Sequence, residues 1–440
     1  MATKALATWA LALQFGNLTE PIVDIAVKSV YNWAGCAIGG YALPPAGIAY
    51  EANAPSSEPM ETLPSLVLET LINGIASHAD DYDDTHRDNP IHPSGPVLSA
   101  LFAVAEWMAP VSGENFLAAF VAGVEAECKI GVAVFPEHYN VGWHITSTVG
   151  SVGSAVAVGK LLGLDTEQMQ RAISIASVQV IGMHESFGTD TKPFHVGAAA
   201  QAGLQSALLA KNGFGGSLEG LEAKRGWSHV VSTRENLTAE ISTLGEVWEI
   251  SRNTFKPYPC DRIIHAAIDG WIQIHDKAVK DSLDFTKIAN VTARTHPRVL
   301  FLTDDPKSET GLQGKFSVYH AAAVALLFGE ATPTQFTDEA VQNKTVIELR
   351  QKVNVTSDDK VSEHEAFVAV EFENGKKLEV HVEHTIGSYE NPLDEKFLHT
   401  KFLDHVGNLI GEDRAKKALS AFTGIANMTD VGQIAREFKK

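Results

Sequence analysis

Apolar residues recur at helical spacing along the first 255 residues, where strand-like alternation is scarce. Residues 149–164 and 195–211 show the pattern most clearly, because Gly and Ala are interspersed there with larger apolar residues. Small side chains let helices approach closely, at some loss of intrinsic helix propensity. The pattern predicts an all-helical domain over residues 1–255.

The longest apolar stretch, residues 116–135, lies within this helical region. It contains Glu125, Glu127 and Lys129, and such charges are costly at the centre of a bilayer. The stretch is therefore predicted to be a buried core helix. Nearer the amino terminus, residues 17–20 have the form of a capping box and predict the start of another helix.

The pattern changes at Lys256-Pro-Tyr-Pro-Cys260, where two prolines interrupt the helical periodicity. Strands are predicted beyond this point at 288–292, 299–302, 353–356, 367–372 and 377–382. The last two flank Asn374-Gly375, a strong hairpin signal that predicts a type I′ turn with positive φ at both positions. Residues 256–394 are therefore predicted to form an α+β domain. Helical periodicity returns afterwards, so residues 395–440 are expected to complete the helical domain.

The chain of 440 residues carries 35 Lys and Arg against 54 Asp and Glu, a formal charge of −19. This charge repels nucleic acid and anionic membranes, so neither is expected as a partner.

Three widely spaced cysteines, Cys36, Cys128 and Cys260, form neither a disulfide framework nor a C-x-x-C metal pair. This use of cysteine fits a reducing compartment, so a cytoplasmic location is expected. The apolar residues after Lys4 resemble a signal peptide but lack a cleavage site, and are interpreted as an ordinary first helix.

The most unusual segment is Ser-His-Ala-Asp-Asp-Tyr-Asp-Asp-Thr-His-Arg at 77–87, followed by His-Pro-Ser at 92–94. Four carboxylates within five residues repel one another unless they are solvated, paired or protonated. They either cap helices in a solvated loop or belong to an acid–base or metal site. Candidate metal ligands are Asp81, Asp84, His86 and His92. Because the spacing of the two histidines is not a familiar zinc pattern, no metal site is expected.

Two further segments carry candidate chemistry. His144 stands at the predicted start of a helix, where the helix dipole favours an anion and a neutral imidazole. Lys192 lies in a Gly- and Thr-rich loop, where it could attract an anionic ligand to this acidic chain. The alternatives are a core histidine bonded to a hydroxyl group and a solvated surface lysine.

These segments together resemble the MmgE/PrpD family over essentially the whole chain. The resemblance rests on Asp81-Tyr-Asp-Asp-Thr85 with His92-Pro-Ser94, on Gly142-Trp-His144, on Thr191-Lys-Pro-Phe-His-Val-Gly197, and on Lys256-Pro-Tyr-Pro-Cys260 with His265. It implies a homodimer of subunits with a large helical domain and a smaller α+β lid, an active site in the cleft between them, and neither metal nor organic cofactor.

Carried over by position, the family's site residues correspond to Asp81, Thr85, His92, His144 and Lys192, with His265 at the domain junction and Tyr319 from the lid. An acid–base pair and carboxylate clamps serve dehydration, decarboxylation and epimerisation alike. His92 and His144 fit the pair; Lys192, Thr85 and Tyr319 fit the clamps. Asp81 could orient an imidazole or take a proton.

The resemblance therefore implies a cofactor-independent lyase, a dehydratase or decarboxylase, acting on a small carboxylate of the 2-methylcitrate or cis-aconitate type. The alternative is an epimerase of an aspartate-derived imino dicarboxylate, because residues 125–144 resemble that branch of the family. A non-catalytic carboxylate-binding protein is a third possibility, but it would have little reason to keep both His92 and His144.

Overall fold

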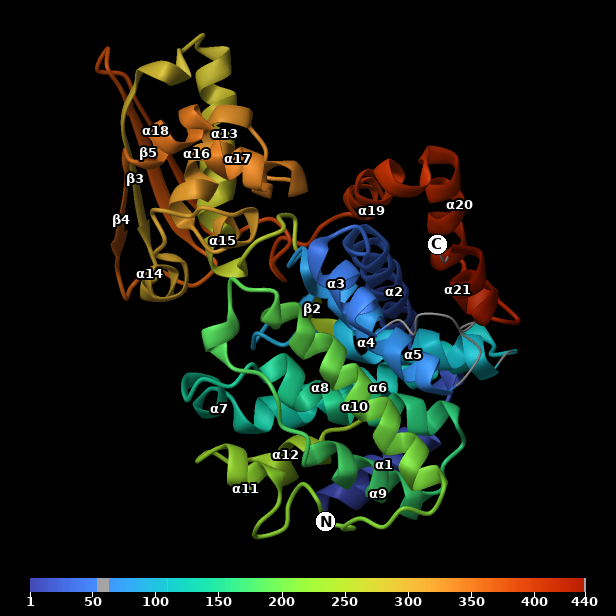
Figure 1. Cartoon of the computed structure of the whole chain (residues 1–440). Helices are drawn as coiled ribbons and strands as arrows, with labels where there is room; N and C mark the ends of the chain where they lie inside the picture. Colours follow the sequence, from blue (N-terminus) through green and yellow to red (C-terminus); the bar gives the residue numbers. More distant parts are fainter. Residues whose placement is uncertain (54–62, 109, 439–440) are drawn as a thin grey trace. The chain divides into compact units, whose positions relative to one another are not determined.

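The computed structural model describes residues 1–53, 63–108 and 110–438. The chain divides into two compact units, coloured along the sequence in Figure 1. Unit 1 comprises Met1–Ala79, Asp83–Thr254 and Glu395–Lys440, and unit 2 comprises Asp80–Tyr82 and Phe255–Asp394. The protein is mainly helical, with a small sheet in unit 2.

Unit 1 is built from helices and one short two-stranded ladder. Its helices are α1 Ala2–Ala12, α2 Glu20–Gly40, α3 Pro44–Asn53, α4 Leu63–Ala79, α5 Ser94–Met108, α6 Gly113–Val134, α7 Glu137–Asn140, α8 Ile145–Leu161, α9 Thr166–Ser177, α10 Thr191–Lys211, α11 Trp227–Val231, α12 Leu237–Ser242, α19 Glu395–Ile410, α20 Glu412–Thr423 and α21 Gly432–Phe438. Strand β1, Thr85–His86, pairs antiparallel with β2, Asn253–Thr254. The ladder joins the acidic segment to the end of the helical region.

Close helix packing in unit 1 depends on the small residues that the sequence displays. A Cβ atom added at Gly74 of α4 would lie 2.4 Å from the Cα of Gly197 in α10. Likewise, a Cβ at Gly150 of α8 would lie 2.6 Å from the Pro96 side chain in α5. Any larger residue would separate these helices, so the glycines fix where the ends of α4, α5, α8 and α10 lie.

Helix α6 confirms the prediction of a buried core helix. Glu125, Glu127 and Lys129 are all fully buried within unit 1. Among the described residues, no helix is both long and apolar enough to cross a membrane.

Unit 2 contains a four-stranded sheet with strand order β4-β3-β5-β6. The strands are β3 Ile288–Thr295, β4 Val353–Ser357, β5 Ala366–Phe372 and β6 Lys377–Val382, and the helices are α13 His265–Lys280, α14 Pro297–Thr303, α15 Gly311–Gly314, α16 Val318–Phe328, α17 Asp338–Gln342 and α18 Lys344–Arg350. Strand β3 runs parallel to β4 and antiparallel to β5, which pairs antiparallel with β6. Helices α13 and α16 bury their apolar residues with those of the strands in one core. The mainly helical fold with an α+β part is thus confirmed.

Three local predictions are wrong. Residues 299–302 belong to helix α14, because Pro297 occupies its first turn and the His296 ring accepts a hydrogen bond from the Arg298 amide. The helix predicted to start at residues 17–20 forms as α2 from Glu20, but its capping box does not: Thr19 is the N-cap, and Asn17 ends a short 3₁₀ turn.

The third concerns the hairpin, which forms as predicted but not with the predicted turn. Gly375 has φ +82°, and Asn374 is absent from the described non-glycine residues with positive φ. The Gly375 amide donates to the Phe372 carbonyl, and the Phe372 amide to the Lys376 carbonyl. A type I turn followed by a left-handed glycine therefore replaces the type I′ turn.

Candidate active site

Three helices of unit 1 begin beside one another. His92 lies two residues before α5, His144 is the N-cap of α8, and Lys192 lies in the first turn of α10. The His92 amide donates to Thr146 Oγ1 of α8 at 3.2 Å. Nδ1 of His144 lies 3.1 Å from Nδ1 of His195 in α10. The amide-rich starts of three helices thus meet at one cluster, an arrangement that favours a bound anion.

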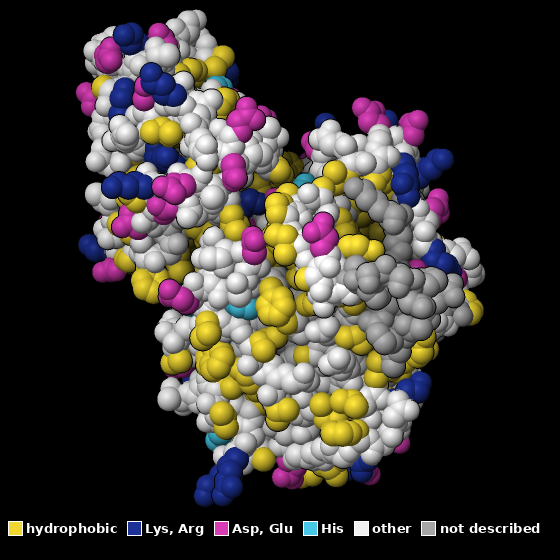
Figure 2. Space-filling view, viewed as in Figure 1, with side chains coloured by type: hydrophobic (Ala, Val, Ile, Leu, Met, Phe, Trp, Pro, Cys, Tyr) yellow, Lys and Arg dark blue, Asp and Glu magenta, His cyan; other side chains and the backbone are white. Residues whose placement is uncertain are grey.

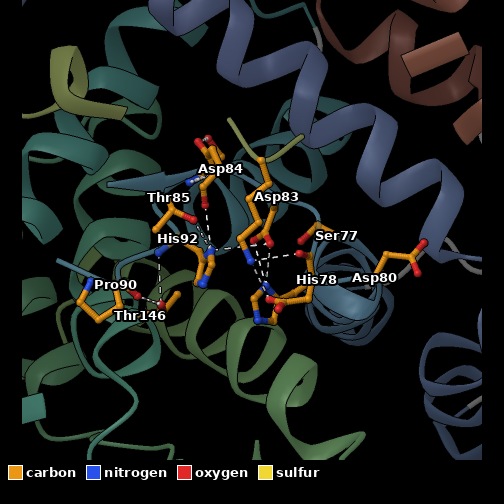
Figure 3. A network of polar contacts seen from close by, with 12 residues as sticks. Ser77, His78, Asp80, Asp83, Asp84, Thr85, Pro90, His92 and Thr146 are labelled. Atoms are coloured by element: carbon orange, nitrogen blue, oxygen red, sulfur yellow. Dashed lines mark hydrogen bonds and ion pairs between the residues drawn. The ribbon is translucent and has the colours of Figure 1, made fainter. Parts of the chain in front are cut away.

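A carboxylate links two imidazoles at this cluster (Figure 3). Nδ1 of His78, in the last turn of α4, lies 2.9 Å from both carboxylate oxygens of Asp83. Nδ1 of His92 lies 3.7 Å from Oδ1 of Asp83, and the two imidazole rings stand edge to face with centroids 4.7 Å apart. All three side chains are buried. They also have one ligand atom each within 4.8 Å of one another, so they could hold a divalent metal ion.

The hydrogen bonds define the tautomer of His92. Its Nδ1 lies 2.8 Å from the main-chain oxygen of Asp84 and 3.3 Å from Thr85 Oγ1. A carbonyl oxygen only accepts, so Nδ1 carries the proton and donates it to Asp84. In the neutral ring the lone pair is therefore on Nε2, the nitrogen available to take a proton from a ligand.

The second half of the cluster consists of His144, His195, Lys192 and Phe187. The Phe187 and His144 rings stand edge to face with centroids 5.1 Å apart. The Lys192 ammonium lies 5.2 Å from the centroid of the Phe187 ring. Lys192 is only 6% exposed, so it is not the solvated surface lysine of the alternative interpretation. A buried ammonium close to imidazoles disfavours any further positive charge.

The pKa values reflect this environment. Burial and then the charge of Lys192 hold the pKa of His144 well below its usual value, with smaller effects from His78, His195 and His92. Burial, His78 and Lys192 lower the pKa of His195 to about 4. His144 is therefore neutral at pH 7, and burial is the largest of these causes.

Asp84 stabilises the loop that carries His92. Its carboxylate accepts hydrogen bonds from the Ser94 hydroxyl and the Asn253 amide, while its main-chain oxygen receives His92. Burial raises the pKa of Asp84 to about 7, although those hydrogen bonds act in the opposite direction. Nε2 of His86 lies 3.0 Å from Oε2 of Glu249, and the Lys129 ammonium donates to Oε1 of the same carboxylate at 2.7 Å. Asp84 and His86 are thus held by structural partners of unit 1.

Unit 2 contains the other predicted site residues. The Lys256 ammonium lies 3.0 Å from Oδ1 and from the main-chain oxygen of Asp81, a residue with φ +53°. Burial and Lys256 hold the pKa of His265 well below its usual value, and its Nε2 lies 3.3 Å from the Cys260 oxygen. Tyr319 donates to Asp304 at 2.6 Å.

The structure thus brings four predicted residues together in unit 1: Thr85, His92, His144 and Lys192. Three further members were missed as site residues, namely His78, Asp83 and His195. Each lies inside a segment that the sequence already distinguished, so residue type alone gave a signal. The four suggested metal ligands do not form a group: among the described residues the potential ligand group is His78, Asp83 and His92.

Fold and site define a two-unit, mainly helical protein with a buried acid–base cluster suited to an anionic ligand. Residues 4–240 match the MmgE/PrpD N-terminal domain and residues 258–424 the MmgE/PrpD C-terminal domain. The chain belongs to the MmgE/PrpD family.

Relatives with named activities are similar along much of the chain. The cis-aconitate decarboxylase of Aspergillus terreus is 25% identical over 98% of this chain and 94% of its own. The Homo sapiens cis-aconitate decarboxylase is 26% identical over 97% and 92%. The 2-methylcitrate dehydratase of Salmonella typhimurium is 26% identical over 69% and 67%.

Proposed function

We propose that this protein is a lyase that removes CO2 or water from a small tricarboxylate of the cis-aconitate or 2-methylcitrate type. The observation that carries the proposal is the convergence of His78, His92, His144 and His195 with Lys192 at three helix starts. Proton carriers and a buried cation at amide-rich helix ends meet the requirements of acid–base chemistry on a polyanion.

Substrate binding would change the protonation of the cluster. His144 is neutral in the structure because burial and Lys192 both disfavour its cation. A bound carboxylate places negative charge against the imidazoles and opposes both effects, so it raises their pKa values. Substrate binding thereby favours the protonated imidazole that the reaction needs.

The two reactions use this proton differently. Loss of CO2 beside a carbon–carbon double bond leaves a carbanion, which accepts one proton from an imidazolium. Dehydration instead removes a proton next to a carboxylate and gives a proton to the departing hydroxyl group. In both reactions Nε2 of His92 and the His144 ring are the proposed proton carriers, while Lys192 and Thr85 hold carboxylates.

Decarboxylation is the favoured of the two reactions. Two cis-aconitate decarboxylases, those of Aspergillus terreus and Homo sapiens reported above, are similar over 98% and 97% of this chain, whereas the 2-methylcitrate dehydratase of Salmonella typhimurium is similar over 69%. A catalytic role for Asp81 and substrate-binding roles for His265 and Tyr319 stay predictions from the family resemblance, as does a homodimeric assembly. A cytoplasmic location also stays a prediction.

The test is an NMR screen of the purified full chain in D2O with cis-aconitate, 2-methylcitrate, citrate and an aspartate-derived imino dicarboxylate. A decarboxylase releases CO2 and places one deuteron on carbon, and a dehydratase creates an alkene. Exchange of an α-proton without change of composition would identify the alternative, an epimerase. Tight binding with no turnover of any of these acids would favour a carboxylate-binding protein and contradict the proposal.

We also propose that catalysis needs no metal ion or organic cofactor, as the family resemblance implies. Activity should survive prolonged dialysis against EDTA. Loss of activity on chelation, with recovery on addition of one divalent metal, would instead assign a metal role to His78, Asp83 and His92.

A further inference from the structure

Unit 2 contains a cavity of about 600 Å³ that the proposed acid–base chemistry does not use. Its wall is formed by residues 306–309, by Tyr319 of α16, and by the ends of α17 and α18 with the start of β4. The lining residues include two cations, Lys307 and Arg350, and one carboxylate, Glu309. This lining is net positive in a chain whose formal charge is −19.

Arg350 is the most informative residue of the cavity. It ends helix α18, is only 6% exposed, and donates one hydrogen bond, from Nη1 to the Ser308 oxygen at 3.2 Å. Within the described part of the chain, no carboxylate oxygen lies within 4 Å of its guanidinium nitrogens. Asp305 acts on it only at longer range, since that carboxylate accepts from the Ser308 hydroxyl and the Lys307 amide.

Burying a guanidinium without a carboxylate partner costs free energy unless a bound anion pairs with it. The main-chain oxygen of Ser308 offsets part of that cost, but it accepts from a single N–H group. A guanidinium has five N–H donors in a planar fork that matches the two oxygens of a carboxylate or phosphate. Arg350 lines a space large enough for such a group, and four of its five donors are not used by the bond to Ser308.

We propose that the cavity of unit 2 is a binding site for a small oxyanion, a carboxylate or a phosphate, held by Arg350 with Lys307 at its rim. Lys307 has no ion-pair partner among the residues that the structure describes, so it supplies a second cation. Gln342 and Gln351 add amide groups to the lining. Tyr319, to which the family resemblance gives a substrate-binding role, also lines the cavity, but neither Arg350 nor Lys307 belongs to the acid–base cluster.

The experiment measures binding to the full chain by isothermal titration calorimetry, with inorganic phosphate and, separately, with tricarballylate, an unreactive tricarboxylate. The Lys192→Ala variant weakens the proposed substrate site and serves as the background. In that background, Arg350→Gln is expected to weaken the remaining site by about tenfold or more. Lys344→Gln, an exposed change on the same helix, is the matched control and should leave binding unchanged.

Two additional variants keep the test decisive if Arg350→Gln fails to fold. Arg350→Lys keeps the charge but loses the fork, and Lys307→Gln alters an exposed residue; each should weaken binding severalfold. Binding of phosphate alone, or of tricarballylate alone, would identify the source of the oxyanion. The proposal is overturned if neither anion binds in the Lys192→Ala background. It is also overturned if the single substitutions Lys192→Ala and Arg350→Gln abolish the same binding event, because the two residues would then serve one site.

Discussion

A main-chain carbonyl gives His92 its proposed role as a proton carrier. The Asp84 oxygen fixes the proton on Nδ1, and Asp83 places a negative charge 3.7 Å from the same nitrogen. The sequence identified the acidic run but not which carboxylate would face the histidines. That choice depends on the backbone between α4 and β1, where Asp81 takes a left-handed conformation that periodicity does not predict. The same uncertainty hid His78, whose orientation depends on the register of α4.

The substitution Asp83→Asn tests this part of the site. It removes the charge that orients His78 and supports protonation of both imidazoles, so kcat should fall by about 10² to 10⁴. The limb of the pH–rate profile due to the imidazoles should also shift to lower pH, because a stabilising anion is lost. Asp88→Asn is the control, since Asp88 is exposed and paired with Arg252. Equal effects of the two substitutions would contradict the assignment.

Glu127 makes a prediction about stability. Both of its carboxyl oxygens are buried and have no hydrogen-bond partner among the described residues, and burial raises its pKa well above the usual value. The folded state therefore retains a proton that the unfolded chain releases above about pH 4.5. Wild-type stability should then decline by about 1.4 kcal/mol per pH unit through this group until its folded pKa is reached.

The variant Glu127→Gln removes that dependence. Its melting temperature relative to wild type should rise as the pH increases from 5 to 8, whereas Glu114→Gln, at the exposed start of the same helix, should show no such trend. A difference that stays constant with pH would show that Glu127 is ionised in the folded state.

Helices position the site through close backbone contacts. The small-residue pattern predicted tight packing but could not indicate which glycines meet, because that requires the crossing points of α4, α5, α8 and α10. Gly74 and Gly197 form one such crossing. It lies one turn from His78 on α4 and close to His195 on α10. Elsewhere, a short apolar run such as 299–302 fits strand and helix equally, and only the cap at His296 decides between them.

The substitution Gly74→Ala is expected to separate α4 from α10. The new methyl group would overlap the Gly197 backbone, so stability should fall by about 1–3 kcal/mol, and kcat should fall by about tenfold or more as His78 moves from the cluster. Gly407→Ala is the control: a Cβ there meets nothing within 4 Å, and a helical alanine should raise stability by about 0.5–1 kcal/mol. Unchanged stability of Gly74→Ala, measured by urea unfolding, would contradict the contact.

For the whole molecule, the sequence predicted the helical part, the α+β part and the family, because composition and motif spacing extend over long segments. A homodimer remains a prediction. Exposed apolar side chains that a dimer interface could cover include Val141, Val178, Met183 and Phe194. Figure 2 shows hydrophobic groups on the face that carries α7 and α10. Sedimentation at micromolar concentration should reveal a dimer with an interface of about 2,000 Å² or more in total. A stable monomer would be evidence against the dimer.

His92 and His144 are proposed to carry protons during turnover of a tricarboxylate. The most direct measurement follows cis-aconitate by NMR in D2O with wild type, His92→Asn, His144→Asn and the exposed control His229→Asn. Wild type and His229→Asn should release CO2 and place one deuteron on carbon, while either site variant should slow that step by about 10² to 10⁴. If wild type turns the acid over and both site variants do so at the same rate, the assigned acid–base site is wrong.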